Sequence, residues 1–280
     1  MRLRLPRRRP RIWRVTILLL AAIYFLGPLA ASIRFSLIQP NGKDGFGNYA
    51  QVFHDQVLAN SLWTSLELAG LTTAIMLVLM VPTVVWVRLR LPRVALLVET
   101  VSVLPIVIPP IVMGAGLAEL QLHAGSGLDN VLFASSLTAL TPFYVILALP
   151  FAYRSLDVGV RAIDLRTLVD AGRSLGASWF TLITRVIVPN MRTAVLTAVS
   201  LTVALVLAEV VIAGTLLYDT YPVELVNQSQ EQVGLAVALS VISLLLTWLL
   251  LFSFTFIGGR HRKMPNPLLG RPVELSGGAP

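Results

Sequence analysis

The sequence predicts an all-α integral membrane protein with six transmembrane helices. Hydrophobic residues make up 56% of the 280 residues and charged residues only 13%, and the mean hydropathy is +0.79. Soluble domains carry about 25% charged residues, so most of this chain is expected to lie in a lipid bilayer. Its basic residues fall on alternate loops, and cytoplasmic loops are those that retain Lys and Arg. Both termini are therefore predicted to be cytoplasmic.

Six apolar stretches are long enough to cross a bilayer as helices, since a helix needs roughly 20 apolar residues to span about 30 Å of hydrocarbon. They are residues 12–33, 62–87, 94–118, 131–152, 193–217 and 233–257. We expect three regions: 1–60, with the Arg-rich N-terminus, the first helix and an outward loop; 61–257, a five-helix core containing the cytoplasmic loop 154–192; and 258–280, a cytoplasmic and disordered tail.

The distribution of charge fixes the expected orientation. Twenty of the 22 basic residues lie in the N-terminal segment, the turn 88–93, the loop 154–192 and the tail, and only Arg34 and Lys43 lie on the other side. In a soluble protein a pI near 10.6 would suggest nucleic-acid binding, but topology explains it here. The apolar run from Ile12 is longer than a signal-peptide core, so we interpret it as an anchor.

Two features interrupt the regular pattern of spans. Residues 36–60 begin polar and rich in glycine and then become apolar, which predicts an outward loop followed by a short helix. The third span contains Pro105, Pro109 and Pro110, and proline bends a helix because it removes a backbone donor. A bend in hydrocarbon requires neighbouring helices, hydroxyls or water. This span therefore either borders a cavity or is kinked only to shape its packing.

Three carboxylates lie within the predicted spans: Glu67, Glu99 and Glu209. An ionisable group in hydrocarbon costs about 2.5 to 3.5 kcal/mol on insertion scales, so it usually faces water or the interior of the bundle. Glu99 is expected at the membrane interface beside Arg93. Glu67 and Glu209 are predicted to lie at similar depth in the outer half of the membrane. They either line a solute pathway, together with Pro105 and Pro109, or bond to a neighbouring helix.

The loop between the fourth and fifth spans contains an amphipathic helix followed by a second short helix. Apolar residues recur at helical spacing from residue 163 to 175. Gly176 is placed to end the first helix and Ser178 to cap the second. The second helix is expected to stop near Val188, because Pro189 disfavours helical geometry in the residue before it. The loop either docks on another protein or, given its arginines, lies on the membrane surface.

Within this loop, Asp170 to Pro189 resembles the cytoplasmic coupling motif of permease subunits in bacterial binding-protein-dependent ABC importers. The usual motif is Glu-Ala-Ala, three residues, Gly, then nine residues to an Ile-x-Leu-Pro ending. The matching positions here are Asp170, Ala171, Gly172, Gly176, Val186, Val188 and Pro189. Asp170 is one methylene shorter than the usual Glu, and Gly172 replaces the second Ala. Both departures are expected to tune the fit to a particular ATPase.

The resemblance implies a type I importer permease fold in the bacterial plasma membrane. It also implies three partners: a cytoplasmic ABC ATPase dimer, a second permease subunit that is a copy or a homologue, and an extracytoplasmic solute-binding protein. By position, Asp170, Ala171, Gly172, Leu175 and Gly176 are expected to contact the ATPase, with Pro189 fixing the return to the fifth span.

The substrate is expected to be a small polar solute. The chain looks most similar to the branch of these importers that transports polyamines, iron, thiamine and phosphonates. Glu67 and Glu209 favour a cation such as spermidine or putrescine, while an anion such as a phosphonate or sulfate stays open.

No catalytic motif is present in the sequence. There is no phosphate loop, HExxH or GxSxG, no cysteine, and the three histidines are far apart. We therefore expect no catalytic residue, metal or cofactor in this subunit, with ATP hydrolysed by a separate partner. The main alternative is a carrier driven by an ion gradient that uses Glu67 and Glu209. An intramembrane enzyme or assembly factor would require clustered catalytic groups.

Overall fold

The computed structural model describes residues 12–39, 42, 44–123 and 135–259. Among these residues the regular elements are all helical, and an isolated β-bridge joins Ile38 to Asp44 after the first helix. The arginine-rich start and the predicted tail from residue 260 lie outside the described residues. The structure confirms the prediction of an all-α fold.

Five helical segments are long and apolar enough to cross a membrane: Trp13–Ser36, Gln56–Arg90, Leu137–Arg161, Arg192–Thr215 and Val233–Phe254. They correspond to α1 (Ile12–Ser36), α3 (Gln56–Arg90), α7 (Ser136–Arg161), α11 (Arg192–Ala208) with α12 (Val211–Thr215), and α14 (Val233–Gly259). The second starts six residues earlier than its apolar stretch, because the Asp55 side chain caps it by accepting from the backbone N–H of Val57 at 2.8 Å. The chain is a multi-pass membrane protein.

The third predicted span is divided into two helices. A 3₁₀ turn at Pro92–Val94 leads into α4 (Ala95–Val107), and α5 (Pro110–His123) follows at an angle of 84°. Pro109 and Pro110 are consecutive residues without a backbone N–H, so helical hydrogen bonding fails there. Pro105, by contrast, lies inside α4 without ending it. The proline pair thus breaks the span, which is a larger distortion than the kink expected from the sequence.

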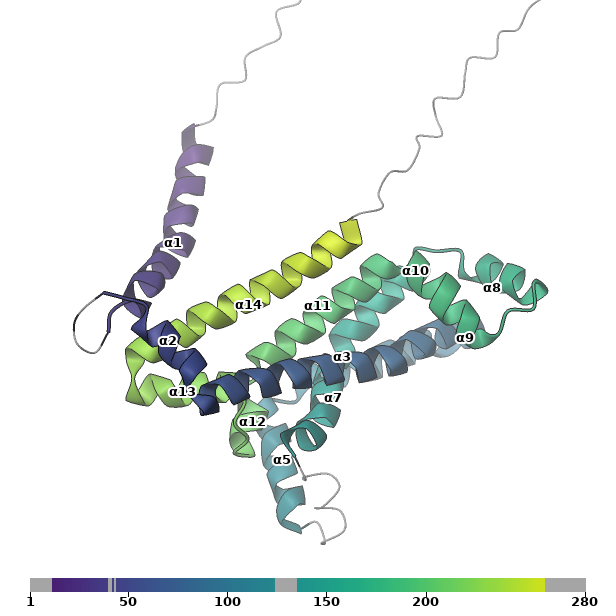
Figure 1. Cartoon of the computed structure of the whole chain (residues 1–280). Helices are drawn as coiled ribbons and strands as arrows, with labels where there is room; N and C mark the ends of the chain where they lie inside the picture. Colours follow the sequence, from purple (N-terminus) through teal and green to yellow (C-terminus); the bar gives the residue numbers. More distant parts are fainter. Residues whose placement is uncertain (1–11, 40–41, 43, 124–134, 260–280) are drawn as a thin grey trace, which may run out of the picture.

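The shorter helices lie at the two ends of the bundle. At one end are α2 (Gly47–His54), which confirms the short helix predicted after the loop, and α13 (Tyr221–Glu231), which was not predicted. At the other end are α8 (Leu165–Ser174), α9 (Trp179–Thr181), a π-helix (Leu182–Ile187) and α10 (Val188–Asn190). We call the end with α8 to α10 the loop end and the end with α2 and α13 the far end (Figure 1).

Three clusters of buried apolar side chains are stacked along the bundle. Along α3 they include, from the far end to the loop end, Leu58, Leu68 and Val84. The far cluster joins α2, α13 and α14 to α3. The middle cluster joins α3, α5, α7, α11 and α12. The loop-end cluster brings α8 and the π-helix into the same core as α3, α7 and α11.

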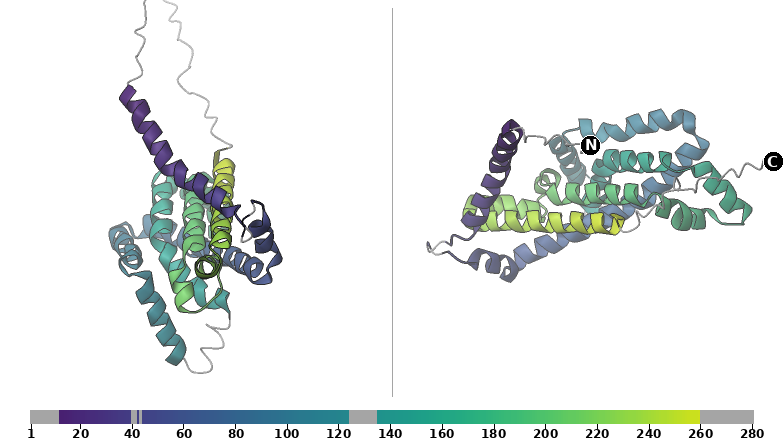
Figure 2. Two further views of the ribbon diagram at one scale, coloured as in Figure 1. Left: turned by 90° about the vertical axis from the view of Figure 1, so that its left-hand side faces the viewer. Right: turned by 90° about the horizontal axis from the view of Figure 1, so that it is seen from above.

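Helix α1 stands apart from this core. Its side chains from Trp13 to Tyr24 are exposed except Ala22, and it packs mainly against α14. Figure 2 shows α1 projecting from the bundle in two further views. An apolar helix left exposed on most sides requires lipid or another transmembrane helix to cover it.

Candidate coupling loop and translocation surface

Helix α8 has a defined start and a defined end. Asp164 caps the start, since its carboxylate accepts from the backbone N–H of Thr167 at 3.3 Å. At the end, the N–H of Ala177 donates to the carbonyl of Gly172 at 3.0 Å and the N–H of Gly176 donates to that of Arg173 at 2.9 Å. This is the Schellman pattern, and it requires the left-handed backbone of Gly176, whose φ is 78°. The prediction that Gly176 ends the helix is confirmed.

The second helix of the loop begins as predicted but ends later. The Ser178 hydroxyl caps it by accepting from the N–H of Thr181 at 3.2 Å. The expected stop near Val188 is wrong, because helical backbone continues through Pro189 to Asn190. The reason is the π-helical segment that precedes Pro189. Its wider turns change which carbonyl faces the proline, and so avoid the clash that proline causes in a regular α-helix.

The loop is packed onto the transmembrane core. Leu165 and Val169 of α8 and Leu182 and Ile187 of the π-helix are buried in the loop-end cluster with residues of α3, α7 and α11. Burying such side chains stabilises a fold by about 1.5 to 3 kcal/mol each. The two short helices and the bundle therefore share one core, and a force applied to the loop is transmitted to three long helices.

Most of the residues predicted to couple to the ATPase are exposed on the surface of the loop. Asp170, Ala171, Leu175, Gly176 and Pro189 are exposed, and Leu175 is 87% exposed. These residues are therefore accessible to a partner protein, as the predicted docking role requires.

Two positions in the loop differ from what the motif alone suggests. Gly172 is half-buried, and a Cβ there would overlap the Leu182 side chain of the same loop. The side chain that packs closely against Gly172 is therefore Leu182 of the same loop. Phe180, which sequence reasoning missed, is 78% exposed beside the docking residues. Its place two residues after the Ser178 cap, in the first turn of the second helix, is the signal that would have indicated it.

A network of ion pairs joins α3, α4 and α7 at the loop end. Asp157, which is buried, accepts from Arg88 in a two-point contact of 2.5 and 2.6 Å and pairs with Arg161 at 2.8 Å. Glu99 pairs with Arg154 at 3.2 Å and with Arg161 at 3.8 Å. These partners replace the Arg93 contact expected for Glu99. Asp157 was missed, although its place one helical turn before Arg161 was visible in the sequence.

Glu209 lies at the break between α11 and α12. One carboxylate oxygen accepts from the backbone N–H groups of Val211 and Ile212 at 2.8 and 3.0 Å, and the other accepts from the hydroxyl of Tyr144 at 2.8 Å. The residue is buried. Its carboxylate therefore caps α12 and holds α7 against it. Of the two interpretations left open for Glu209, this geometry supports the helix-to-helix bond, and a role in the pathway stays a prediction.

Glu67 is in a different environment. It is exposed on α3, and among the described residues it makes no hydrogen bond or ion pair. Arg88 follows it by 21 residues, which corresponds to about 32 Å along a helix. With Arg88 at one membrane boundary, Glu67 reaches the opposite boundary or just inside it. A carboxylate at that depth requires water or a polar partner beside it.

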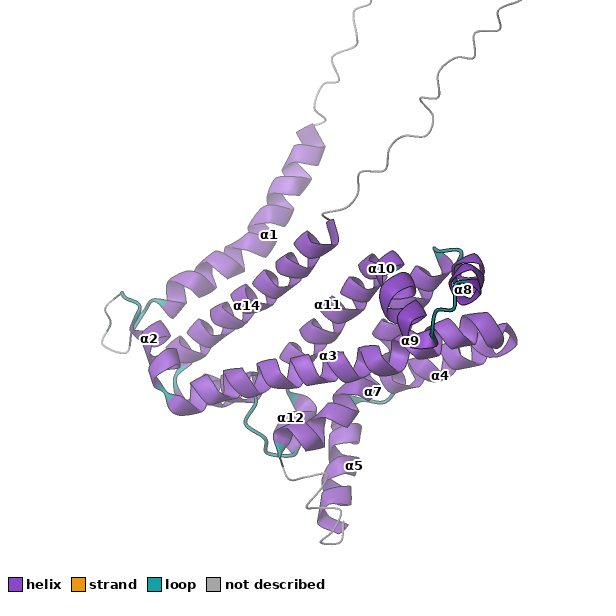
Figure 3. Ribbon diagram, turned by 45° about the vertical axis from the view of Figure 1, so that its right-hand side comes forward, coloured by secondary structure: helices purple, strands orange, loops and turns teal. Residues whose placement is uncertain are grey.

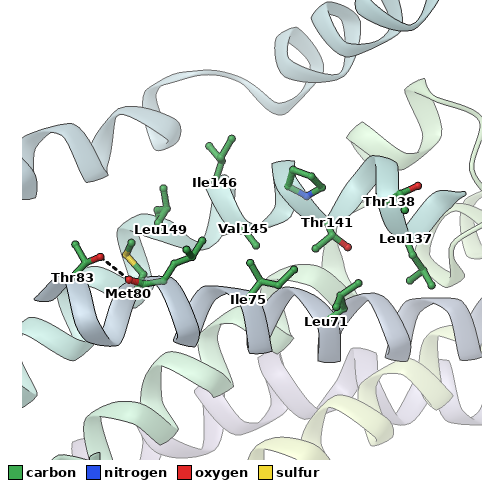
Figure 4. Close-up of a pocket in the computed structure, with 12 residues that line it drawn as sticks. Leu71, Ile75, Met80, Thr83, Leu137, Thr138, Thr141, Val145, Ile146 and Leu149 are labelled. Atoms are coloured by element: carbon green, nitrogen blue, oxygen red, sulfur yellow. Dashed lines mark hydrogen bonds between the residues drawn. The ribbon is translucent and has the colours of Figure 1, made fainter. Parts of the chain in front are cut away.

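An apolar groove of about 710 Å³ begins one turn below Glu67. Figure 4 shows its two walls, with Leu71 and Ile75 on α3 facing Thr141 and Val145 on α7. Leu71, Ile75 and Leu79 follow Glu67 at intervals of four residues, so they lie on the same face of the helix. The lining is almost entirely apolar, which suits a neighbouring helix or lipid and does not suit a polar solute.

The two broken spans meet at the middle of the bundle. Helix α5 packs against α12, and a Cβ on Gly114 would come within 3.0 Å of the Thr215 hydroxyl. Pro105 is buried in α4, while Pro109 is exposed at the break before α5. The structure thus brings the N-terminal half of α5 together with the last residue of α12. Each of these helices follows a break in its transmembrane span.

Comparison with known proteins gives one informative similarity. The chain matches no family model. It is 29% identical over 217 residues to a protein of Haloferax volcanii named as a probable molybdenum ABC transporter permease, covering 76% of this chain and 77% of that protein. Over three quarters of its length, this chain is therefore similar to an ABC transporter permease.

Proposed function

We propose that the chain is the transmembrane permease subunit of an ATP-driven ABC importer and forms half of its translocation pathway. The loop α8 to α10 carries this proposal, because it exposes a docking surface while its other face is part of the transmembrane core. The similarity to a probable ABC transporter permease supports it independently. ATP hydrolysis then belongs to a cytoplasmic ATPase dimer that contacts Asp170, Ala171, Leu175 and Gly176.

In this proposal the loop transmits motion of the ATPase to the membrane helices. The shared core carries displacement of α8 to α3, α7 and α11. The broken spans α4/α5 and α11/α12 are the segments best suited to rearrange, since their ends are not held by a continuous helical backbone. The solute path then opens and closes where α5 meets α12.

The proposal includes a second permease subunit, either a copy or a homologue. Three features of this chain remain uncovered: α1, the apolar groove between α3 and α7, and the exposed carboxylate Glu67. A second permease would bury apolar surface on the first two and place a polar environment beside the third. An extracytoplasmic solute-binding protein would deliver substrate to the far end.

For the substrate we propose a small oxyanion of the molybdate type. The relative from Haloferax volcanii is named for molybdenum, which exists in oxygenated water as an oxyanion. The polyamine interpretation lacks support from this relative. It also loses one of its two carboxylates, because Glu209 is occupied by Tyr144 and two backbone N–H groups.

Co-purification from the native plasma membrane tests the central claim. The tagged wild type is compared with Asp170→Ala/Leu175→Ala, and with Arg185→Gln as a control on the exposed side of the π-helix. We expect an ABC ATPase with the wild type and the control and its loss from the double variant. Absence of an ATPase from the intact wild-type complex, with uptake abolished by an ionophore, would instead establish a carrier driven by an ion gradient.

A further inference from the structure

Two adjoining pockets lie where the end of α3 meets α8 and α9. One, of about 330 Å³, is lined by polar and apolar residues of all three segments: Leu89, Arg90, Arg166, Val169, Asp170, Arg173 and Trp179. The other, of about 660 Å³, is lined mainly by apolar ones: Pro82, Thr83, Val85, Trp86, Arg90, Leu91, Trp179 and Ile183. Arg90 and Trp179 line both pockets, so the two form one continuous amphipathic site. Figure 3 shows α8 and α9 beside this end of α3.

The polar pocket has the charge of an anion site. Its lining contains three arginines and one aspartate, which gives a net charge of +2. Arg90 and Arg166 make no ion pair or hydrogen bond among the described residues, whereas Arg173 lies over the Trp179 ring at 5.9 Å. Asp170 forms no ion pair with any of them within the described part of the chain. Arg173 also donates to the carbonyl of Ala177 at 3.5 Å, so Arg90 and Arg166 are the arginines of this pocket that are available to a ligand from outside.

The apolar pocket lies on the membrane side of the same site. It extends along α3 from Arg90 back to Pro82, toward the interior of the bilayer. Trp86 is 65% exposed at its wall, and tryptophan is enriched at the level of lipid headgroups. A cavity that is basic at the membrane surface and greasy just below it matches a phospholipid, with a phosphate above and an acyl chain beneath.

We propose that this site binds an anionic phospholipid of the cytoplasmic leaflet and holds it against the coupling loop. Basic pockets beside transmembrane helices on the cytoplasmic side are suited to anionic headgroups. The inference rests on the proposed function for its orientation, since the loop must face the cytoplasm. The bound lipid would connect Arg90 of α3 to Arg166 and Arg173 of α8, so membrane composition would influence how firmly the loop is held.

Native mass spectrometry of the purified complex tests the proposal, with vesicle lipids of phosphatidylglycerol and phosphatidylcholine supplied in equal amounts. We expect the wild type to retain phosphatidylglycerol in preference to phosphatidylcholine. Arg90→Gln and Arg166→Gln should each weaken its retention about fivefold, since a basic residue near an anionic surface contributes about 1 kcal/mol. Arg93→Gln is the matched control, because Arg93 is exposed in the following turn but lines neither pocket. Arg166→Gln changes an exposed residue of α8, so it tests the site even if Arg90→Gln fails to fold.

Three results would overturn the inference. Equal retention of the two lipids would show no headgroup selectivity, and displacement of phosphatidylglycerol by millimolar inorganic phosphate would show a site for free anions. Loss of the ATPase from Arg166→Gln with lipid retention unchanged would assign the arginines to the partner protein. Because lipid is counted on the permease itself, its absence is distinguishable from the absence of an ATPase, which would count against the proposed function.

Discussion

The two ends of the bundle differ in whether their buried carboxylates are paired with cationic side chains. At the loop end, Asp157 is buried between Arg88 and Arg161, and each carboxylate oxygen has a cationic partner. At the far end, Glu224 is buried, and within the described residues only the Asn227 amide donates to its carboxylate, at 3.5 Å. Glu67, toward the same end of α3, is exposed and has no partner in that part of the chain. The buried carboxylate at the loop end is paired with cationic side chains of the same chain, and the buried carboxylate at the far end is not.

The interior of the loop end is therefore held by the chain's own ion pairs and packing, whereas the far end is expected to gain polar partners from another subunit or a solute. A paired, packed loop end transmits force without rearranging internally. An unpaired far end gains stability when another subunit or a solute supplies what it lacks. The comparison therefore predicts that substitutions of the buried and closely packed residues at the loop end act on folding, whereas substitutions at the far end act on assembly, transport and pH dependence.

The largest effect is expected from Asp157→Asn. It leaves the half-buried Arg88 without its two-point partner; breaking one side of a buried pair costs about 3 to 5 kcal/mol, and the partial exposure of Arg88 lowers that cost. Chemical unfolding in detergent micelles measures the change in the free energy of unfolding. The double variant Arg88→Met/Asp157→Leu removes both charges and should recover most of the loss. If Asp157→Asn is as stable as the wild type, the ion pair between Arg88 and Asp157 does not stabilise the loop end.

A second effect at the loop end is expected from Gly172→Val. A side chain there overlaps Leu182, and overpacking a core typically costs about 1 to 3 kcal/mol. Adding Leu182→Ala should restore part of the lost stability, because it makes room for the new side chain. Additive losses in the double variant would mean that the two helices of the loop do not contact each other as the structure places them.

Much of the structure at the loop end was predictable from the sequence, because it depends on residues that are close together in the chain. The end of α8 and the start of α9 depend on Gly176 and Ser178, which are two positions apart, whereas the Asp164 cap at the start of α8 was not predicted. The π-helix before Pro189 was not predictable, because its alternative, an early stop, is equally consistent with the local residues. The pairing of Arg88 with Asp157 spans 69 positions, and no spacing rule indicates a contact between separate helices.

The carboxylates nearer the middle of the bundle show the same limit. The sequence placed Glu67 and Glu209 at similar depth, and the neighbours of both belong to the middle cluster. It did not distinguish their environments, since that depends on helix rotation and on the break after Ala208. The bend at Pro109, in contrast, was predictable from residue type alone, although its size was not.

Comparing Glu209→Ala with Glu67→Ala sharpens this distinction. Glu209→Ala leaves the buried Tyr144 hydroxyl and a backbone N–H unsatisfied, which costs about 1 to 3 kcal/mol for each orphaned group. Glu67→Ala should leave the melting temperature unchanged, since no side chain or backbone group in the described part of the chain bonds to it, but should lower uptake in a reconstituted importer at least tenfold. Equal thermal stability of the two variants would contradict the assigned roles.

The smallest effect is expected from Glu224→Gln, and it depends on pH. Glu224 lies in α13, outside the helices that can cross a membrane; burial, reinforced by the nearby charge of Asp219, raises the pKa of its carboxyl above the usual range. The folded state therefore holds this proton more tightly than the unfolded state, whose carboxyl titrates near about pH 4.3. The resulting contribution to stability is complete below that pH and is lost as the pH rises through the raised pKa.

Glu224→Gln removes the titratable carboxyl, and with it this dependence of stability on pH. We expect the variant to be more stable than the wild type at pH 7.5, by about 1 kcal/mol or less, and equally stable at pH 4.5. Thermal unfolding at both pH values gives the comparison, with the exposed Glu231→Gln as the control at the end of the same helix. A variant that is less stable at pH 7.5 would mean that the ionised carboxylate has a cationic partner at the far end, and the contrast between the two ends would then fail.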